Sequence, residues 1–177
     1  MTADAISRAV QRVRVVLSRH PGAGIHADEP AIARWQSGLR VVCSHANGTQ
    51  IATDLPAQVG GTGDQVTPGW LLRAGLASCL TTRIAMEAVT AGVVLTHLEV
   101  SAESTSDARG LLGMTTDRGE PITAGPREVR LHVRVGAAGI ARERLQAIVE
   151  ESHRCSPVSA AVASVVPIDV TIEIDPS

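Results

Sequence analysis

The sequence contains no lysine, tyrosine or phenylalanine, and two tryptophans are its only large aromatic residues. Without lysine the protein cannot form a Schiff base or use an amine as a general base. With so few aromatics it cannot build the stacking platform on which proteins bind single-stranded nucleic acid. The net charge is only −2, and charges of both signs are interspersed. The composition therefore predicts no nucleic-acid or membrane partner.

Cysteine is scarce as well, with Cys43, Cys79 and Cys155 as its only positions. An odd number of cysteines does not suit a disulfide framework, and the N-terminus lacks the apolar run of a signal peptide. The apolar stretch at residues 13–17 contains Arg14 and is too short to span a membrane. These features predict a protein of the reducing cytoplasm.

The most informative stretch is the apolar segment from Thr67 to about residue 91. Thr67 suits the N-cap of a helix and Pro68 the first helical position, where a missing N–H costs nothing. The charged residues of this segment are Arg73, Arg83 and Glu87. A helix that is apolar nearly all round must be covered on several sides. We therefore expect a buried central helix with Cys79 deep in the fold, about three turns from the N-terminus.

The second thiol follows another helical pattern, at residues 140–153. Ser156 suits the N-cap of a further short helix that begins at Pro157 and reaches about residue 164. Cys155 is thus expected just before a helix N-terminus, where the positive end of the dipole favours a thiolate. Two thiols far apart in sequence can meet in space, although a lone free cysteine is more often a small buried apolar residue.

The remaining patterns predict an α+β fold with antiparallel sheet. Residues 3–19 have the spacing of an amphipathic helix, and the Gly- and Ala-rich stretch that follows divides the chain into residues 1–30 and a domain at 31–177. Apolar alternation predicts strands at 31–43, 49–55, 94–102, 129–135 and 166–174. Asn47-Gly48 indicates a hairpin turn. The glycines at 60–63 predict a flexible loop before the central helix, and residues 104–126 form a long loop.

Three motifs follow one another along the chain. They are Pro68…Leu72-x-x-Gly75-Leu76-x-Ser78-Cys79-Leu80, then Asp107-x-Arg109-Gly110, and then His153-Arg154-Cys155-Ser156-Pro157-Val158. Together they resemble the OsmC/Ohr family of thiol-dependent peroxidases, over roughly residues 31–175. The resemblance implies an OsmC-like fold without a cofactor, in an intertwined homodimer whose long helices are buried between two sheets.

The resemblance also implies a function in oxidative stress defence. Cys79 would reduce an organic hydroperoxide, Cys155 would close a disulfide with it, and a dithiol such as a lipoyl-bearing protein would reduce that disulfide. Cys43 would be a bystander. A binding or redox-sensing dimer with weak turnover is the alternative.

In the family an arginine holds the thiolate, and a glutamate near the start of the cysteine helix holds that arginine. Arg40 is the best match for the arginine, although a solvated strand residue is an equally simple interpretation. Arg83, one turn after Cys79, is a local alternative, and so is its pairing with Glu87 at i+4. Gly69 stands at the position of the glutamate, which predicts an arginine without its usual partner and a weakened peroxidase.

Two further patterns have simple interpretations. Cys79, His153 and Cys155 would supply at most three metal ligands without a CxxC pair, so no metal is predicted. Asp107 and Arg109 are expected to form a local pair within a turn, in a loop that could lie near the pocket in a dimer.

Overall fold

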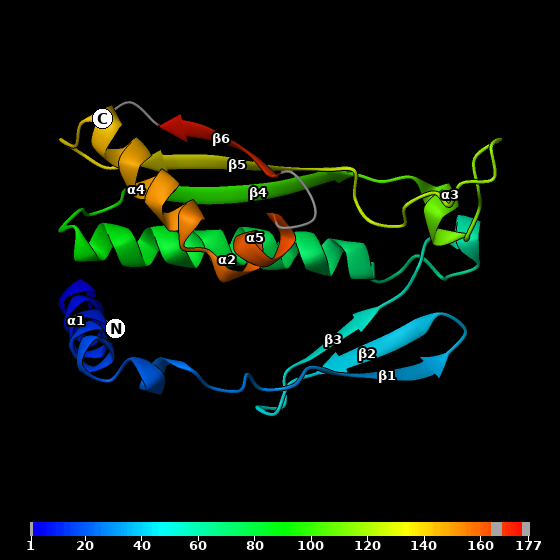
Figure 1. Ribbon diagram of the computed structural model, residues 1–177, viewed down its shortest axis with the longest axis horizontal. Helices are drawn as coiled ribbons and strands as arrows, with labels where there is room; N and C mark the ends of the chain where they lie inside the picture. The colour runs from blue at the N-terminus through cyan, green and yellow to red at the C-terminus, as the bar shows by residue number, and fades with distance from the viewer. Residues whose placement is uncertain (1, 164–167, 175–177) are drawn as a thin grey trace. The chain divides into compact units, whose positions relative to one another are not determined.

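The computed structural model describes residues 2–163 and 168–174. The chain divides into two compact units, one formed by Met1–Val10 and Arg73–Ser177 and the other by Gln11–Leu72. Figure 1 shows the helices and strands along the chain. Within the described ranges no helix combines the length and apolar character needed to cross a membrane. The predicted division between residues 1–30 and 31–177 stays a prediction.

The first helix, α1 (Ala3–Arg19), confirms the amphipathic pattern and ends at a 3-10 turn, Pro21–Gly24. None of its residues is buried, and Val13 keeps 56% of its surface exposed. The apolar stripe of α1 is therefore not covered within the described chain.

Three short antiparallel strands form the sheet of the Gln11–Leu72 unit, in the order β1 (Ile32–Ser37), β2 (Arg40–Ser44) and β3 (Gln50–Thr53). The single strand predicted for 31–43 is wrong, because Gly38 adopts a φ of +56° and turns the chain into a hairpin. The turn predicted at Asn47-Gly48, between β2 and β3, is confirmed. The inward face predicted for the first strand is also wrong, since every residue of β1 is exposed.

Helix α2 (Pro68–Thr90) confirms the predicted cysteine helix. The Oγ1 atom of Thr67 accepts a hydrogen bond from the Trp70 N–H at 3.1 Å, so the predicted N-cap is present. The fully buried residues of α2 form one stripe of four, spaced at i+4: Leu76, Leu80, Ile84 and Ala88. The chain by itself thus buries one stripe of this helix rather than several sides.

The second sheet has the order β4 (His97–Thr105), β5 (Glu128–Gly136) and β6 (Ile168–Ile174), and its buried side chains form one core with the α2 stripe. Strands β4 and β5 are antiparallel, but β5 and β6 are parallel. The predicted α+β fold with antiparallel sheet is confirmed except for the β5–β6 pair, which is parallel. Five strands were predicted, and the described residues form six strands in two sheets.

Two helices make the crossover that a parallel pair requires. They are α4 (Arg142–Arg154) and α5 (Pro157–Ala163), which connect β5 to β6 (Figure 1). The buried side chains of α4 belong to the same core as those of α2 and β5. The end of α5 predicted at residue 164 and the strand start predicted at residue 166 lie outside the described residues.

Candidate functional site

Cys79 lies in the middle of α2 and is half-buried, so the prediction of a deeply buried thiol is wrong for the chain by itself. A hollow of about 310 Å³ opens beside it, lined by Ser78, Cys79, Thr82, Arg83 and Pro157. The hollow is formed by one face of α2 and by the first residue of α5. It gives a small molecule access to the sulfur.

Arg83 shares this hollow with the thiol. Its Nη2 atom lies 3.5 Å from Glu87 Oε2, which confirms the predicted i+4 pair. Its Nε atom is buried and has no hydrogen-bond partner among the described residues. The guanidinium therefore keeps hydrogen-bonding capacity beside Cys79.

The junction between α4 and α5 meets the cysteine helix through Ser156, which is fully buried. Its hydroxyl donates a hydrogen bond to Cys79 Sγ, with 3.3 Å between oxygen and sulfur. Ser156 does precede Pro157 as the predicted N-cap would, yet its side-chain hydrogen bond within the described chain goes to the thiol. The structure thus brings the neighbour of Cys155 into contact with Cys79.

Cys155 itself faces a carboxylate. Its Sγ donates to Glu151 Oε1 at 3.3 Å, and the Nε and Nη2 atoms of Arg154 donate to the same carboxylate at 2.8 and 2.5 Å. The hydrogen bond from Arg154, followed by that from Cys155, lowers the pKa of Glu151 to about 2. Glu151 is therefore charged at neutral pH. All three cysteines lie in the described ranges, and each is a free thiol.

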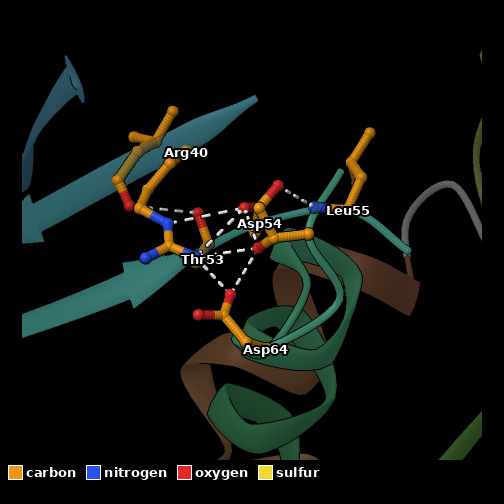
Figure 2. A network of polar contacts seen from close by, with 7 residues as sticks. Arg40, Thr53, Asp54, Leu55 and Asp64 are labelled. Carbon is orange, nitrogen blue, oxygen red and sulfur yellow. Dashed lines mark hydrogen bonds and ion pairs between the residues drawn. The ribbon is translucent and has the colours of Figure 1, made fainter. Parts of the chain in front are cut away.

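Arg40, at the start of β2, lies in a network of carboxylates and a hydroxyl within the Gln11–Leu72 unit (Figure 2). Its Nε and Nη2 atoms donate to Asp54 Oδ2 at 3.4 Å, and Nη2 also donates to Thr62 Oγ1 at 2.8 Å. Asp64 accepts a further hydrogen bond from Nη2. Arg40 is thus held by two aspartates of its own unit, while Gly69 offers it no carboxylate in place of the family glutamate.

Asp54 is the buried member of this network, with 1% of its side chain exposed. It accepts hydrogen bonds from Thr62 Oγ1 and from the Leu55 N–H, both at 2.7 Å. The Thr62 hydrogen bond is the largest cause that lowers the pKa of Asp54. Arg40 and then Thr62 lower the pKa of Asp64 to about 2. Both aspartates therefore keep their charge opposite the guanidinium.

The glycine-rich segment at 60–63 packs closely against this network. A Cβ atom at Gly61 would lie 1.8 Å from the Leu55 carbonyl oxygen and 2.8 Å from Asp54 Oδ1. Only glycine allows so close an approach of two backbone segments. This segment carries Thr62 into the network around Arg40, and Asp64 follows it directly; the flexibility predicted for the loop stays a prediction.

The Asp107-x-Arg109-Gly110 motif forms hydrogen bonds and ion pairs within the long loop. Asp107 caps the short helix α3 (Ala108–Leu111) by accepting from the Arg109 N–H at 3.0 Å, and its Oδ2 accepts from Arg109 Nη2 at 2.7 Å. This confirms the predicted local pair. Arg127 adds a second guanidinium at 2.7 Å. Arg109 is the first cause that lowers the pKa of Asp107 to about 2.

Within residues 2–163 and 168–174, no three His, Cys, Asp or Glu side chains are grouped so as to hold a metal ion. His153 was considered above as a metal ligand together with Cys79 and Cys155. It is half-buried, and burial lowers its pKa. Its imidazole is therefore neutral at physiological pH.

Comparisons with known proteins agree with this architecture. The family model for OsmC-like proteins matches residues 61–171, a range that contains Cys79 and Cys155 but not Arg40. No curated protein sequence gives a significant match. An OsmC-like protein of Mycoplasma pneumoniae is structurally similar, with a TM-score of 0.71 and 15% identity over 86% of this chain and 100% of that chain.

Two further solved structures carry the name organic hydroperoxide resistance protein. The one from Legionella pneumophila has a TM-score of 0.60 and 22% identity, over 85% of this chain and 100% of that chain. The one from Elizabethkingia anophelis has a TM-score of 0.65 and 20% identity, with the same coverage. At these identities the likeness shows the fold alone. The family match covers more than half of the sequence, and this chain therefore belongs to the OsmC-like protein family.

Proposed function

We propose that this protein is a thiol-dependent peroxidase in which Cys79 reduces an organic hydroperoxide and Cys155 resolves the product. The observation that carries the proposal is the hydrogen bond from Ser156 Oγ to Cys79 Sγ, because it brings the segment of the second thiol to the first. Family membership and the names of the two hydroperoxide resistance proteins give further support.

The chemistry takes place in two steps. The Cys79 thiolate attacks one peroxide oxygen, the O–O bond breaks, and the alkoxide that leaves takes up a proton to become an alcohol. Cys79 is then a sulfenic acid, which the Cys155 thiol attacks to give a disulfide and water. An external dithiol, such as a lipoyl-bearing protein, reduces the disulfide by exchange.

The first step needs a cation close to the thiolate, and two arginines are candidates. The resemblance to the peroxidases favours Arg40, whose guanidinium is held by Asp54 and Asp64. The hollow favours Arg83, which lines it together with Cys79. We expect Arg40→Gln to lower peroxide turnover more than Arg83→Gln, because the family arginine acts directly on the thiolate.

We also propose that the protein works as a homodimer. The described residues bury only one stripe of α2 fully, while Trp70 and Leu72 at its beginning keep 47% and 38% of their surface exposed. A second copy would cover this apolar surface. Light scattering should give the mass of a dimer at micromolar concentration, and a folded monomer would refute this part of the proposal.

Peroxide consumption with a dithiol reductant tests the activity directly. Wild type should consume cumene hydroperoxide, Cys79→Ser should be inactive, and Cys155→Ser should leave a sulfenic acid at Cys79 that dimedone can trap. Cys43→Ser is the matched control and should keep wild-type turnover. Wild type that consumes no peroxide would favour a binding or redox-sensing dimer.

A further inference from the structure

We infer that the Ser156 hydroxyl is a catalytic group, which activates Cys79 by donating a hydrogen bond to its sulfur. The inference deepens the proposed function, since it concerns the same thiol. Ser156 Oγ lies 3.3 Å from Cys79 Sγ, and Ser156 is fully buried. A buried hydroxyl with one partner is fixed in direction, so its dipole is aimed at the sulfur before any substrate arrives.

The local backbone keeps this hydroxyl in place. The Ser156 N–H donates to the His153 carbonyl at 3.1 Å, and the Ser156 carbonyl accepts from the Ala160 N–H at 2.9 Å. Ser156 is thus tied to the end of α4 and to the first turn of α5. Among the described residues its side-chain oxygen has no hydrogen-bond partner besides Cys79. An N-cap serine usually uses this oxygen to accept a backbone N–H, so the arrangement departs from ordinary capping.

The consequence for the chemistry follows from the charge on the sulfur. A hydrogen bond to an ionised acceptor is stronger than one to a neutral acceptor, so the hydroxyl favours the thiolate over the thiol. The thiolate is the nucleophile that attacks the peroxide. Because the hydroxyl donates without losing its proton, Ser156 is unchanged when the sulfenic acid forms. In the reduced protein the hydroxyl of Ser156 donates to Cys79, while the Cys155 thiol donates to Glu151.

Alkylation by iodoacetamide tests this inference without any peroxide. The rate of labelling is followed separately for Cys79 and Cys155 by peptide mass spectrometry, between pH 5 and pH 9, in the full chain with its native cysteines. Ser156→Ala should slow the labelling of Cys79 about ten-fold near neutral pH, which corresponds to one lost hydrogen bond to a charged group.

Ser159→Ala is the matched control. Ser159 lies within α5 and, like Ser156, is buried, with 2% of its surface exposed; its Oγ has no hydrogen-bond partner among the described residues. Its replacement should leave the labelling of Cys79 unchanged. Ser156→Thr keeps a hydroxyl and should retain most of the wild-type rate.

Two results would overturn the inference: an unchanged Cys79 profile in Ser156→Ala, or an equal loss in Ser156→Thr, which would indicate packing rather than the hydroxyl. The proposed function can fail separately. A wild type that consumes no peroxide, together with slow labelling in Ser156→Ala, would refute the peroxidase and leave the role of Ser156 standing.

Discussion

Replacing Gly61 by alanine is expected to disrupt the network around Arg40. The new Cβ would lie 1.8 Å from the oxygen and 2.4 Å from the carbon of the Leu55 carbonyl. Non-bonded heavy atoms normally stay about 3.5 Å apart, so the two segments must separate by more than an ångström. Both contacts are with backbone, and no side-chain rotation can relieve them. The movement would draw Thr62 away from Asp54.

Overpacking of this kind costs about 1–3 kcal/mol, and in a protein of this size each kcal/mol lowers Tm by roughly 2–4 °C. We therefore expect Gly61→Ala to lower Tm by about 2–12 °C. Differential scanning calorimetry measures the shift. If Arg40 is the cation of the site, peroxide turnover should fall as well, measured at a temperature where the variant is folded.

Gly22→Ala is the control for this experiment. A Cβ there meets no atom within 4 Å, and the same loss of backbone freedom in the unfolded chain applies to both variants. Its Tm should equal that of wild type or rise by about 1–4 °C. If Gly61→Ala melts at the same temperature as Gly22→Ala, the close packing of residues 60–63 against Leu55 and Asp54 is refuted.

Three other outcomes follow from the polar contacts. Gly69→Glu should change peroxide turnover less than about two-fold, that is by less than about 0.4 kcal/mol, because Arg40 is already paired; a ten-fold gain would contradict this. Glu151→Gln should speed the alkylation of Cys155, since it removes the negative charge beside the thiol, and Glu150→Gln should not. Carboxyls whose pKa is lowered from 3.8 or 4.5 to about 2 stabilise the fold when the pH is above those ordinary pKa values. They lose this contribution as the pH falls toward 2. They belong to Asp64, Asp107 and Glu151. The urea concentration at the midpoint of unfolding should therefore decrease as the pH is lowered from about 4.5 to about 2. The decrease should be smaller in Asp107→Asn than in wild type.

Local patterns predicted most of the helices and strands. The apolar run after Thr67-Pro68 predicted α2, and clean alternation predicted β4 and β5 to within a few residues. The hairpin at Gly38 was missed because alternation continues on both sides of it, so the pattern reads as one strand. The parallel pairing of β5 with β6 could have been predicted from the sequence. Two helices lie between these strands, and a helical crossover favours parallel neighbours.

The candidate site was predictable only in part, because its members lie far apart in sequence. The motifs indicated Cys79 and Cys155, and the i−4 spacing of Glu151 from Cys155 on one helix could have suggested their contact. No local pattern shows that Asp54 and Asp64 converge on Arg40 from 14 and 24 residues away. Likewise, the capping preference of a serine before a proline hid the contact from Ser156 to Cys79, 77 residues away.

A titration of the reduced protein with cumene hydroperoxide, followed by thiol counting and peptide mapping, tests the peroxidase proposal most directly. One equivalent of peroxide should remove two thiols and leave a disulfide between Cys79 and Cys155, while Cys43 remains a free thiol. No loss of thiols, or a disulfide that contains Cys43, would contradict the proposal.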